Sequence, residues 1–291
     1  MRELAEYAAL VESRLGGMVD SLGEIPSPLR DAMLYSLCAG GKRLRPALLL
    51  ASCEAMGGDA ESAMPFACGL EMIHTYSLIH DDLPCMDNDD LRRGRPTNHK
   101  VYGEAVAVLA GDGLLHGAME LMLRAACGMK DLRGVRAAEA IARRSGVTGM
   151  VAGQNNDVTL EGTVPTPEKV RYIHTHKTAD LLTAPIEAGM LLAGADTAQL
   201  EKGIAYGQSL GIAFQIVDDL LDLEGDAAVL GKQTGMDAQL GKLTWPAAFG
   251  VEQSRRDAES YIRQACEAAT VFGENSHWFE KLAEQSLTRV S

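Results

Sequence analysis

The chain has 291 residues, of which 46% are hydrophobic and 23% charged, and this composition is typical of a globular protein with one large domain or two modest ones. Its formal net charge of −13 argues against nucleic acid and against anionic membrane surfaces as general partners. If the ligand is anionic, arginines near the site or a bound divalent cation must reverse the local field.

The cysteines and the N-terminal segment bear on where the protein works. The six cysteines are scattered without a Cys-x-x-Cys pair, and most lie among apolar residues, as reduced thiols of a cytoplasmic protein do. Residues 1–22 carry charges every few positions and predict an amphipathic helix rather than a signal peptide. No apolar run approaches the roughly 18 residues that a membrane-spanning helix needs. We therefore expect a soluble, cytoplasmic protein without stable membrane association.

Segments with helical spacing follow one another along the chain. They are rich in Ala, Leu and Met, are separated by Gly, Pro, Asn and Asp, and lie at residues 4–15, 62–79, 104–123, 135–153, 180–194 and 200–223. Several are apolar nearly all round, which predicts helices inside a bundle. The pattern predicts an all-α fold of about ten helices in one domain over residues 1–291. The stretch 224–246, with two Gly-Lys pairs, predicts a long loop that is either functional or disordered.

The first of two aspartate clusters follows the apolar stretch at residues 62–79. Pro84 separates Asp81 and Asp82 from Asp87, and a proline bends or ends a helix. The spacing predicts that a helix ends near Asp81 and that Asp87 folds back towards it from the next turn.

The second cluster lies inside the apolar segment 200–223. Asp218 and Asp222 are four residues apart, so on a helix they project from one face, with Asp219 beside them. Ionised carboxylates on a core helix are costly unless cations or a metal ion pair with them. A solvated stripe is the alternative, although the leucines among these aspartates fit it less well.

The donor atoms of the two clusters restrict the choice of metal. A calcium loop of the EF-hand type fails because Leu91 and Arg92 stand where a ligand and a glycine are needed. A di-iron bundle needs a second Glu-x-x-His step besides Glu71–His74, and we expect none; zinc needs Cys and His ligands that neither cluster has. Mg²⁺ takes carboxylate, water and phosphate oxygens, so we predict two carboxylate walls that hold Mg²⁺ ions and, through them, a diphosphate.

The clusters and the motifs around them resemble the trans-prenyl diphosphate synthases, and among these the bacterial farnesyl diphosphate synthases most. The matching motifs occur in the family's order and lie at residues 40–46, 71–82, 81–87, 90–97, 109–115, 153–162, 176–178, 214–222 and 231–246. They span most of the chain, so chance similarity is a poor explanation. The resemblance implies an isoprenoid synthase fold, with helices around a central cavity, and a homodimer.

The resemblance also implies a role for each polar residue of these motifs. The Mg²⁺ ligands, for about three ions per site, would be Asp81, Asp87 and Asp218, with Asp82 and Asp222 as supporting carboxylates. The allylic diphosphate would be bound by Arg92, Lys177 and Lys232. Isopentenyl diphosphate would be bound by Lys42, Arg45, His74 and Arg93. Thr178 and Gln215 would lie along the reacting allylic carbon.

Several of these residues have a plainer interpretation when each is taken alone. The basic residues 42–45 are compatible with a solvated helix start, and Lys232 with an exposed loop position. His74 and Gln215 are compatible with hydrogen-bonded core residues. The ordered set of motifs favours the functional interpretation in each case.

A chain-length determinant is expected at Tyr76 and Ser77, which lie five and four residues before Asp81. On a helix that rises about 1.5 Å per residue, Tyr76 is about 7–8 Å from the metal site. In the family an aromatic residue at this position is linked to a C15 product. The alternative is that Tyr76 fills the core and satisfies its hydroxyl there.

Three other functions compete with farnesyl diphosphate synthesis. A geranylgeranyl or geranyl diphosphate synthase differs only in product length. A terpene cyclase usually replaces the second aspartate motif and does not need the basic motif at residues 40–46. A non-catalytic partner subunit would be expected to lack some of the aspartates or Lys232, and none is missing.

Overall fold

The computed structural model describes residues 1–224 and 241–288. Within these ranges the chain is helical apart from one pair of two-residue strands, which confirms the predicted all-α class. The chain divides into two compact units, residues 1–142 with 188–194 and residues 143–187 with 195–291. The boundaries between them lie inside helices α7 (Arg133–Ser145) and α10 (Asp180–Ala193) and directly after α10. The single domain and its central cavity stay predictions.

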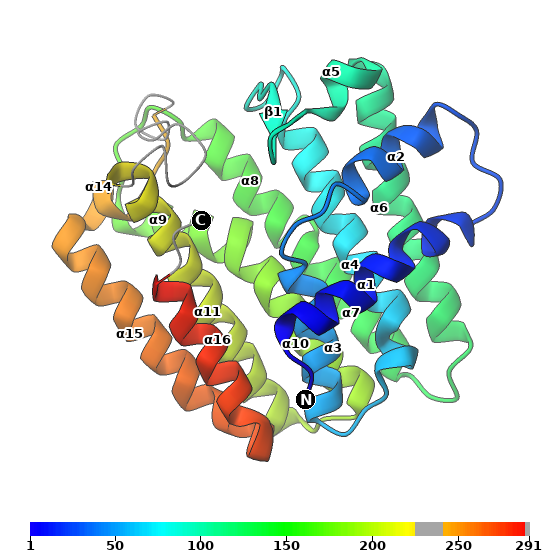
Figure 1. Ribbon diagram of the computed structural model, residues 1–291. Helices are drawn as coiled ribbons and strands as arrows, with labels where there is room; N and C mark the ends of the chain where they lie inside the picture. The colour runs from blue at the N-terminus through cyan, green and yellow to red at the C-terminus, as the bar shows by residue number, and fades with distance from the viewer. Residues whose placement is uncertain (225–240, 289–291) are drawn as a thin grey trace. The chain divides into compact units, whose positions relative to one another are not determined.

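The first unit is built around helix α4. Its complete elements are α1 (Leu4–Asp20), α2 (Leu29–Leu37), α3 (Leu44–Ala55), α4 (Ala60–Asp81), β1 (Leu91–Arg92), β2 (Arg95–Pro96), α5 (Asn98–Tyr102) and α6 (Glu104–Cys127). Helix α4 begins where the Asp59 side chain accepts a hydrogen bond from the backbone N–H of Ser62 at 2.9 Å. It buries residues on all of its faces and contacts both α3 and α6 (Figure 1), as expected for an interior helix.

Small residues allow α4 and α6 to approach closely. A Cβ atom at Gly69 of α4 would lie 2.9 Å from Cγ of Met122 of α6, and one at Gly111 of α6 would lie 2.1 Å from Nε2 of His80. At both positions the neighbouring side chain lies so close that a residue larger than glycine would not fit unless that side chain moved. The close approach holds the end of α4 firmly against α6.

Helix α6 corrects one expectation about apolar runs. By length and composition alone its 24 residues, Glu104–Cys127, are apolar enough to cross a membrane, and 44% of the apolar window is buried within the protein. The expectation that no apolar run is long enough was wrong for this segment, because isolated polar residues such as Asp112 and His116 lie within a helix that is otherwise apolar. The core helix of a globular protein meets the same criterion, so the finding is weak evidence for a membrane span.

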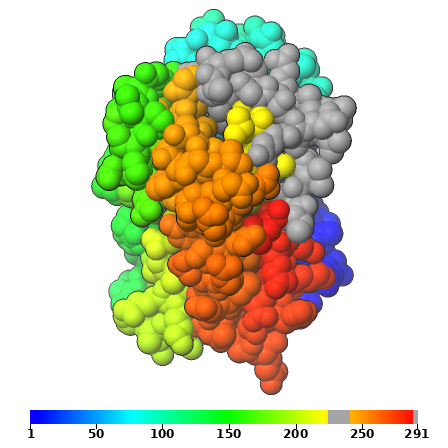
Figure 2. Space-filling view, turned by 90° about the vertical axis from the view of Figure 1, so that its left-hand side faces the viewer, coloured from blue at the N-terminus to red at the C-terminus, as the bar shows by residue number. Residues whose placement is uncertain are grey.

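The second unit is built around the long helix α11. Its complete elements are α8 (Met150–Thr159), α9 (Pro167–Ile173), the π-helix η1 (His174–Ala179), α11 (Thr197–Glu224), α14 (Trp245–Phe249), α15 (Val251–Ala269), the 3₁₀-helix η2 (Thr270–Asn275) and α16 (Ser276–Thr288). Helix α11 contacts α15 and α16, and the last two lie side by side, in orange and red, on the face shown in Figure 2.

Aromatic side chains fill the interior of the second unit. Tyr206 of α11 is fully buried and donates from its hydroxyl to the carbonyl oxygen of Phe279 in α16 at 2.9 Å. Trp245 packs with apolar side chains of α9 and α11 in one buried cluster, which includes Ile173 and Ile216. This apolar cluster lies directly beside the second aspartate cluster, since the backbone N–H of Trp245 bonds to Asp219. It packs against the C-terminal part of α11 and holds it in place.

Candidate active site

The first aspartate cluster lies where α4 ends. The helix ends at Asp81, and turns follow around Pro84. The backbone N–H of Asp87 donates to the carbonyl oxygen of Asp81 at 2.9 Å, and that of Asn88 donates to Leu83 at 3.1 Å. Asp87 therefore folds back to the helix end, as the spacing predicted, and the two carboxylates start from neighbouring backbone positions.

Burial and an arginine distinguish Asp82 from its neighbours. Its side chain is 4% exposed, and one of its oxygens accepts from Nε and Nη2 of Arg92 at 2.7 and 2.6 Å. Burial raises the pKa of Asp82 above its usual value, and the charge of Arg92 limits the increase. Arg92 also reaches Asp89 at 3.4 Å. The carboxylate of Asp82 thus holds the arginine that was predicted to bind the allylic diphosphate.

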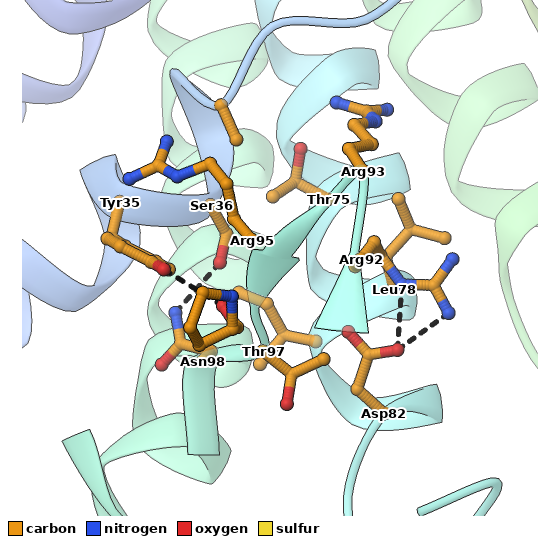
Figure 3. Close-up of a pocket in the computed structure, with 13 residues that line it drawn as sticks. Tyr35, Ser36, Thr75, Leu78, Asp82, Arg92, Arg93, Arg95, Thr97 and Asn98 are labelled. Carbon is orange, nitrogen blue, oxygen red and sulfur yellow. Dashed lines mark hydrogen bonds and ion pairs between the residues drawn. The ribbon is translucent and has the colours of Figure 1, made fainter. Parts of the chain in front are cut away.

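A short hairpin carries the arginines that follow the cluster (Figure 3). β1 and β2 pair in antiparallel fashion, with Leu91 opposite Pro96, through a two-residue turn. Both turn residues, Arg93 and Gly94, have positive φ, 53° and 73°, as a type I′ turn requires. An Asn-Gly pair would have indicated this hairpin from the sequence, but here an arginine takes the first left-handed position, so the hairpin was not predicted.

The hairpin arginines contact α2 and the segment after it. Nη1 of Arg93 donates to the carbonyl oxygen of Gly40, and its guanidinium covers Gly41, where a Cβ atom would lie 2.7 Å from Cζ. The guanidinium of Arg95 lies 4.4 Å from the ring centroid of Tyr35, a cation–π contact (Figure 3). The glycines of the motif at residues 40–46 thus leave room for Arg93, a residue predicted to bind isopentenyl diphosphate.

Thr97 and Asn98 tie the aspartate loop to the helical framework, a function that the sequence analysis missed. The hydroxyl of Thr97 donates to the carbonyl oxygen of Asp89 at 2.8 Å, and Nδ2 of Asn98 donates to that of Ala32 in α2 at 2.8 Å. Both side chains are only 2% exposed. Two small polar residues directly after an acidic and basic run were the available signal, since such residues commonly bond to nearby backbone.

A small pocket lies among these elements of the first unit (Figure 3). Its walls come from α2, the end of α4 and the hairpin, and they include the guanidinium groups of Arg92, Arg93 and Arg95 and the carboxylate of Asp82. The pocket is open to solvent on one side, so its walls do not enclose a cavity. The pocket therefore gathers three guanidinium groups and one buried carboxylate at the end of α4.

The basic motif before α3 contains one buried arginine. Arg43 is 3% exposed and forms ion pairs of 2.5 Å with Glu12 and 2.5 Å with Glu71. The interpretation as a solvated helix start is therefore wrong for Arg43, whose loss would leave the carboxylate of Glu71 buried without its cation. Lys42 beside it is exposed, as expected of a residue that meets a ligand from solvent.

The pairing of Glu71 also bears on the di-iron alternative. A second Glu-x-x-His step does occur, at Glu274–His277, contrary to expectation. The His277 side chain is, however, 88% exposed, and Glu71 is bound to Arg43. A di-iron core needs a carboxylate and an imidazole that are both buried and able to bind the metal. The first step fails because its glutamate is paired with an arginine, and the second fails because its histidine is exposed.

His74 and Arg45 are brought together by α4 and α3. Nη1 of Arg45 lies 3.3 Å from Nε2 of His74. Burial lowers the pKa of His74 well below its usual value, and the positive charges of Arg45 and Arg93 lower it further. The imidazole is therefore neutral near pH 7 and accepts a hydrogen bond from Arg45. These two predicted ligands of isopentenyl diphosphate are thus in direct contact with each other.

Tyr76 and Ser77 occupy different environments on α4. Tyr76 is 8% exposed, and its ring meets that of His80 edge-on at 5.6 Å between centroids. Burial raises the pKa of the Tyr76 hydroxyl, and the nearby charge of Asp81 raises it further. The hydroxyl of Ser77 donates to the carbonyl oxygen of His74 at 2.9 Å, within the helix. A control of chain length by these residues stays a prediction.

In the second unit Lys177 lies in the π-helical turn η1. Such turns are rare and frequently occur at functional sites. Two glycines let neighbouring helices approach it. A Cβ atom at Gly153 of α8 would lie 2.1 Å from the backbone nitrogen of Lys177, and one at Gly211 of α11 would lie 2.4 Å from the backbone of Ala179. The π-turn is therefore held between α8 and α11 at backbone contact distance.

Two lysines converge on the buried carboxylate of Asp157. Nζ of Lys177 lies 2.5 Å and Nζ of Lys242 lies 3.1 Å from the same oxygen, and Lys242 also lies 2.6 Å from Glu161. Burial by itself would raise the pKa of Asp157, but the two lysines hold it below its usual value. Sequence reasoning assigned no role to the motif at residues 153–162; in the structure its carboxylates position these lysines.

The second aspartate cluster lies on one side of α11. Asp222 is buried and Asp218 is half-buried, four residues before it on the same helix face. Asp219 accepts from the backbone N–H of Trp245 at 2.7 Å and from Nε2 of Gln215 at 2.9 Å. Asp219 thus has a local structural function, which agrees with its absence from the predicted metal ligands.

Thr178 and Gln215 are the other predicted residues that the second unit brings together. The hydroxyl of Thr178, on η1, donates to Oε1 of Gln215, on α11, at 2.8 Å. The predicted diphosphate ligand Lys232 lies outside the described residues. Thr178, Gln215 and Lys177 therefore belong to one packed region of the second unit, built from η1, α8 and α11.

The oxygen donors fit magnesium better than a metal that needs a protein cage. Within residues 1–224 and 241–288 no group of three or more Asp, Glu, His or Cys side chains lies close enough to hold a metal ion. Mg²⁺ needs no such group, because it takes one or two carboxylates and fills its shell with water and phosphate oxygens. Asp81 with Asp87, and Asp218 with Asp222, are donors of this kind.

Comparison with known proteins identifies the class of enzyme. The sequence profile of the polyprenyl synthetase family matches residues 26–276. The chain therefore belongs to the polyprenyl synthetase family. It is a prenyltransferase of the trans-prenyl diphosphate synthase type, so the class that its motifs predicted is confirmed.

The relatives of this chain include enzymes with products of different length. A chloroplastic geranylgeranyl pyrophosphate synthase of Capsicum annuum is 48% identical over 241 residues, which cover 82% of this chain and 65% of that protein. The farnesyl diphosphate synthase of Geobacillus stearothermophilus is 46% identical over 267 residues, which cover 90% and 88%. The crystal structure of an FPP/GFPP synthase from Zymomonas mobilis is similar with a TM-score of 0.84 and 34% identity, and the match covers 97% and 98% of the two chains.

Proposed function

We propose that this chain condenses isopentenyl diphosphate first with dimethylallyl diphosphate and then with geranyl diphosphate to give (2E,6E)-farnesyl diphosphate and diphosphate. The observation that carries the C15 product is Tyr76, buried in α4 five residues before Asp81. At about 1.5 Å per residue its ring lies about 7–8 Å along the helix from the first cluster. A ring at this depth would stop a growing prenyl chain after a few isoprene units.

Geranylgeranyl diphosphate synthesis is the second candidate function. The 48% identity with the Capsicum annuum enzyme favours it, since the two reactions differ by a single further C5 addition. A terpene cyclase or a non-catalytic subunit is less well supported, because both aspartate clusters and the basic motif at residues 40–46 are intact. The distinction within the proposal is therefore one of product length.

The carboxylates of both clusters are the metal ligands in this proposal. Asp81, Asp87 and Asp218 would ligate about three Mg²⁺ ions, with Asp82 and Asp222 as supporting carboxylates. When bound, Mg²⁺ would neutralise the negative charge that develops on the departing diphosphate. Asp82 contributes indirectly, since its ion pair keeps Arg92 in one orientation.

The basic side chains are the diphosphate ligands. Those for the allylic diphosphate are Arg92, Lys177 and Lys232, and those for isopentenyl diphosphate are Lys42, Arg45, His74 and Arg93. Arginine suits this task because its planar fork matches two phosphate oxygens at once. The ion pairs of Arg92 with Asp82 and of Lys177 with Asp157 orient both cations before a ligand binds.

The reaction follows from these groups. Departure of diphosphate leaves an allylic cation, which the double bond of isopentenyl diphosphate attacks, and loss of a proton completes the product. The dipoles of Thr178 and Gln215 would stabilise the cation without forming a bond to it, whereas an ionised carboxylate would capture it. A strong side-chain base is not required, because the released diphosphate can accept the proton.

Assembly and location follow the same reasoning. We propose a homodimer, as the family resemblance implies. We also propose a cytoplasmic location, which is supported by six cysteines that are all free thiols.

One experiment tests both the activity and the product. The protein is incubated with Mg²⁺, isopentenyl diphosphate and each allylic primer, and the dephosphorylated alcohols are separated by chain length. We expect C15, and we expect Tyr76→Ala to lengthen the product towards C20. A C20 product of the unaltered chain would assign geranylgeranyl synthesis, an unchanged length in the variant would place the chain-length limit elsewhere, and no product with any primer would refute the proposal.

A further inference from the structure

Four polar side chains form a ladder between η1 and α11 in the second unit. His174 and Thr178 lie four residues apart on η1, and Asp219 and Gln215 lie four residues apart on α11. Nε2 of His174 lies 3.2 Å from Oδ2 of Asp219, and Thr178 donates to Gln215 at 2.8 Å. Gln215 donates to Asp219 at 2.9 Å and closes the set. We call these four residues the polar ladder.

Three residues of the polar ladder are buried and Gln215 is half-buried, and both carboxylate oxygens of Asp219 accept hydrogen bonds. His174 is 3%, Asp219 4% and Thr178 9% exposed. Besides the ladder, the backbone N–H of Trp245 donates to Oδ2 of Asp219 at 2.7 Å, and the indole ring stacks on His174 at 5.3 Å between centroids. Both oxygens of Asp219 therefore have donors inside the protein. The bonds at Asp219 keep a fixed geometry, because a lost bond would leave a polar group unsatisfied in the interior. Nδ1 of His174 is buried and has no hydrogen-bond partner among the described residues.

The chemistry of the groups sets the direction of every hydrogen bond in the ladder. A carboxylate only accepts, so the Gln215 amide must turn its NH₂ towards Asp219 and its oxygen towards Thr178. The Thr178 hydroxyl must then donate its single proton to Gln215. After this bond Thr178 has only lone pairs to offer to any other group.

We infer that His174 and Asp219 are positioning residues, which act through Gln215 to make Thr178 an acceptor towards the bound allylic group. This inference rests on the proposed function, in which Thr178 and Gln215 lie along the reacting carbon. Lone pairs stabilise a developing positive charge, whereas an O–H proton that points the same way would oppose it. The ladder thus sets the sign of the dipole that meets the cation.

Asp219→Asn reverses the ladder with little change in shape. Two donors, Trp245 N–H and His174 Nε2, lie at Oδ2, so the single oxygen of the new side chain stays there and its NH₂ faces Gln215. The Gln215 amide must turn over, and Thr178 becomes the acceptor with a free proton. We expect kcat to fall about 10- to 100-fold, with both KM values within about threefold of the unaltered enzyme.

A double-mutant cycle separates this effect from other consequences of the substitution. Thr178→Val removes the hydroxyl, so adding Asp219→Asn to it should lower kcat by no more than about threefold. The matched control is Asp257→Asn, since Asp257 also accepts from a glutamine four residues before it, Gln253, at 2.7 Å and from Trp245 at 2.8 Å but does not reach Thr178. We expect it to leave kcat unchanged. Multiplicative losses in the double variant, or a shifted Mg²⁺ requirement in Asp219→Asn, would overturn the inference.

A second measurement does not depend on turnover. In protein labelled with ¹⁵N in histidine and glutamine side chains, we expect NMR to place the His174 proton on Nε2. We also expect the Gln215 amide protons to exchange slowly, and to exchange faster or shift in Asp219→Asn but not in Asp257→Asn. A His174 proton on Nδ1 alone, or rapidly exchanging Gln215 protons, would overturn the inference. These signals test the ladder even if the chain formed no prenyl product, which would refute only the proposed function.

Discussion

The two aspartate clusters are presented by opposite structural means. In the first unit the carboxylates lie where a helix ends, and the cations beside them come from a hairpin only a few residues further along. In the second unit the carboxylates lie within an unbroken helix, and Lys177 lies on the π-turn η1, which packs against that helix from some 40 residues earlier in the chain. One cluster is thus made by local chain folding and the other by the packing of distant helices.

The difference shows where each cluster is vulnerable. The first depends on hydrogen bonds that anchor a loop, such as that from Thr97 to Asp89. The second depends on close backbone contacts, such as that of Gly153 with Lys177. A substitution that loosens a loop should therefore affect ligand binding in the first unit, whereas one that separates helices should affect the fold of the second.

The largest effect is expected when each cluster loses one of its aspartates. Asp81→Ala combined with Asp218→Ala should lower kcat by at least about 10³-fold, because charge on the departing diphosphate would lose its metal ions. Steady-state turnover, with circular dichroism to show that the variant is folded, measures this. Asp90→Ala is the control, since Asp90 is exposed and pairs with Lys100 at 2.7 Å, and it should change kcat less than about twofold. Undiminished turnover in the double variant would contradict the proposed metal site.

A glycine in each unit tests the dependence on helix contacts. Gly153→Ala places a Cβ atom 2.1 Å from backbone, so it should lower the free energy of unfolding by about 1–3 kcal/mol in urea titrations. Gly17→Ala is the matched control in α1 of the first unit, because nothing lies within 4 Å of its added Cβ atom. That change should stabilise the protein by about 0.5–1 kcal/mol. Equal stability of the two variants would mean that the contact at η1 is not tight.

Loosening the first cluster should have a smaller effect that is mainly on binding. Thr97→Val removes the hydrogen bond to the Asp89 carbonyl oxygen and should weaken binding of the allylic diphosphate by about 1 kcal/mol. We therefore expect a severalfold higher KM for this substrate at nearly constant kcat. Thr159→Val removes a comparable bond of 2.7 Å to the Asn155 carbonyl oxygen on an exposed helix face, and should leave KM unchanged. If Thr97→Val lowered kcat instead, the loop would contribute more than the position of its ligands.

The last effect concerns pH and belongs to the first unit, and it does not change turnover near pH 7. Because the pKa of His74 is well below its unfolded value, the unfolded chain binds a proton that the folded chain does not. Stability from this residue is present above about pH 6.5 and is lost as pH falls, by at most about 1.4 kcal/mol per pH unit. Urea unfolding of the unaltered protein and His74→Gln between pH 5 and 8 checks this. The variant should have the flatter profile; parallel profiles would show that His74 keeps its proton on folding.

The same comparison explains how much the sequence could predict. The first cluster was predicted almost completely, because Asp81, Pro84 and Asp87 lie within one short stretch whose geometry follows from helix and proline rules. The hairpin beside it escaped, since Arg93 adopts a left-handed conformation that favours glycine or asparagine. Local rules therefore gave the path of the backbone but not its exceptions.

The second cluster and the buried ion pairs show the limit more clearly. Spacing placed Asp218 and Asp222 on one face, but nothing near them indicated that Asp219 would accept from Trp245, 26 residues later. The burial of Arg43 between Glu12 and Glu71 was equally hidden, because the partners come from two other helices. The family resemblance supplied roles for these positions, whereas pairing between distant residues required coordinates.

The shared carboxylate of Asp157 has a consequence for which anions can compete at this enzyme. Lys177 is already neutralised at 2.5 Å, so an incoming anion must attract its ammonium group more strongly than a buried carboxylate does. Chloride or acetate brings one charge and gains nothing from the exchange, whereas a diphosphate brings several charges on adjacent oxygens. An internal counter-ion of this kind makes the resting lysine indifferent to common cellular salts and responsive to polyvalent ones.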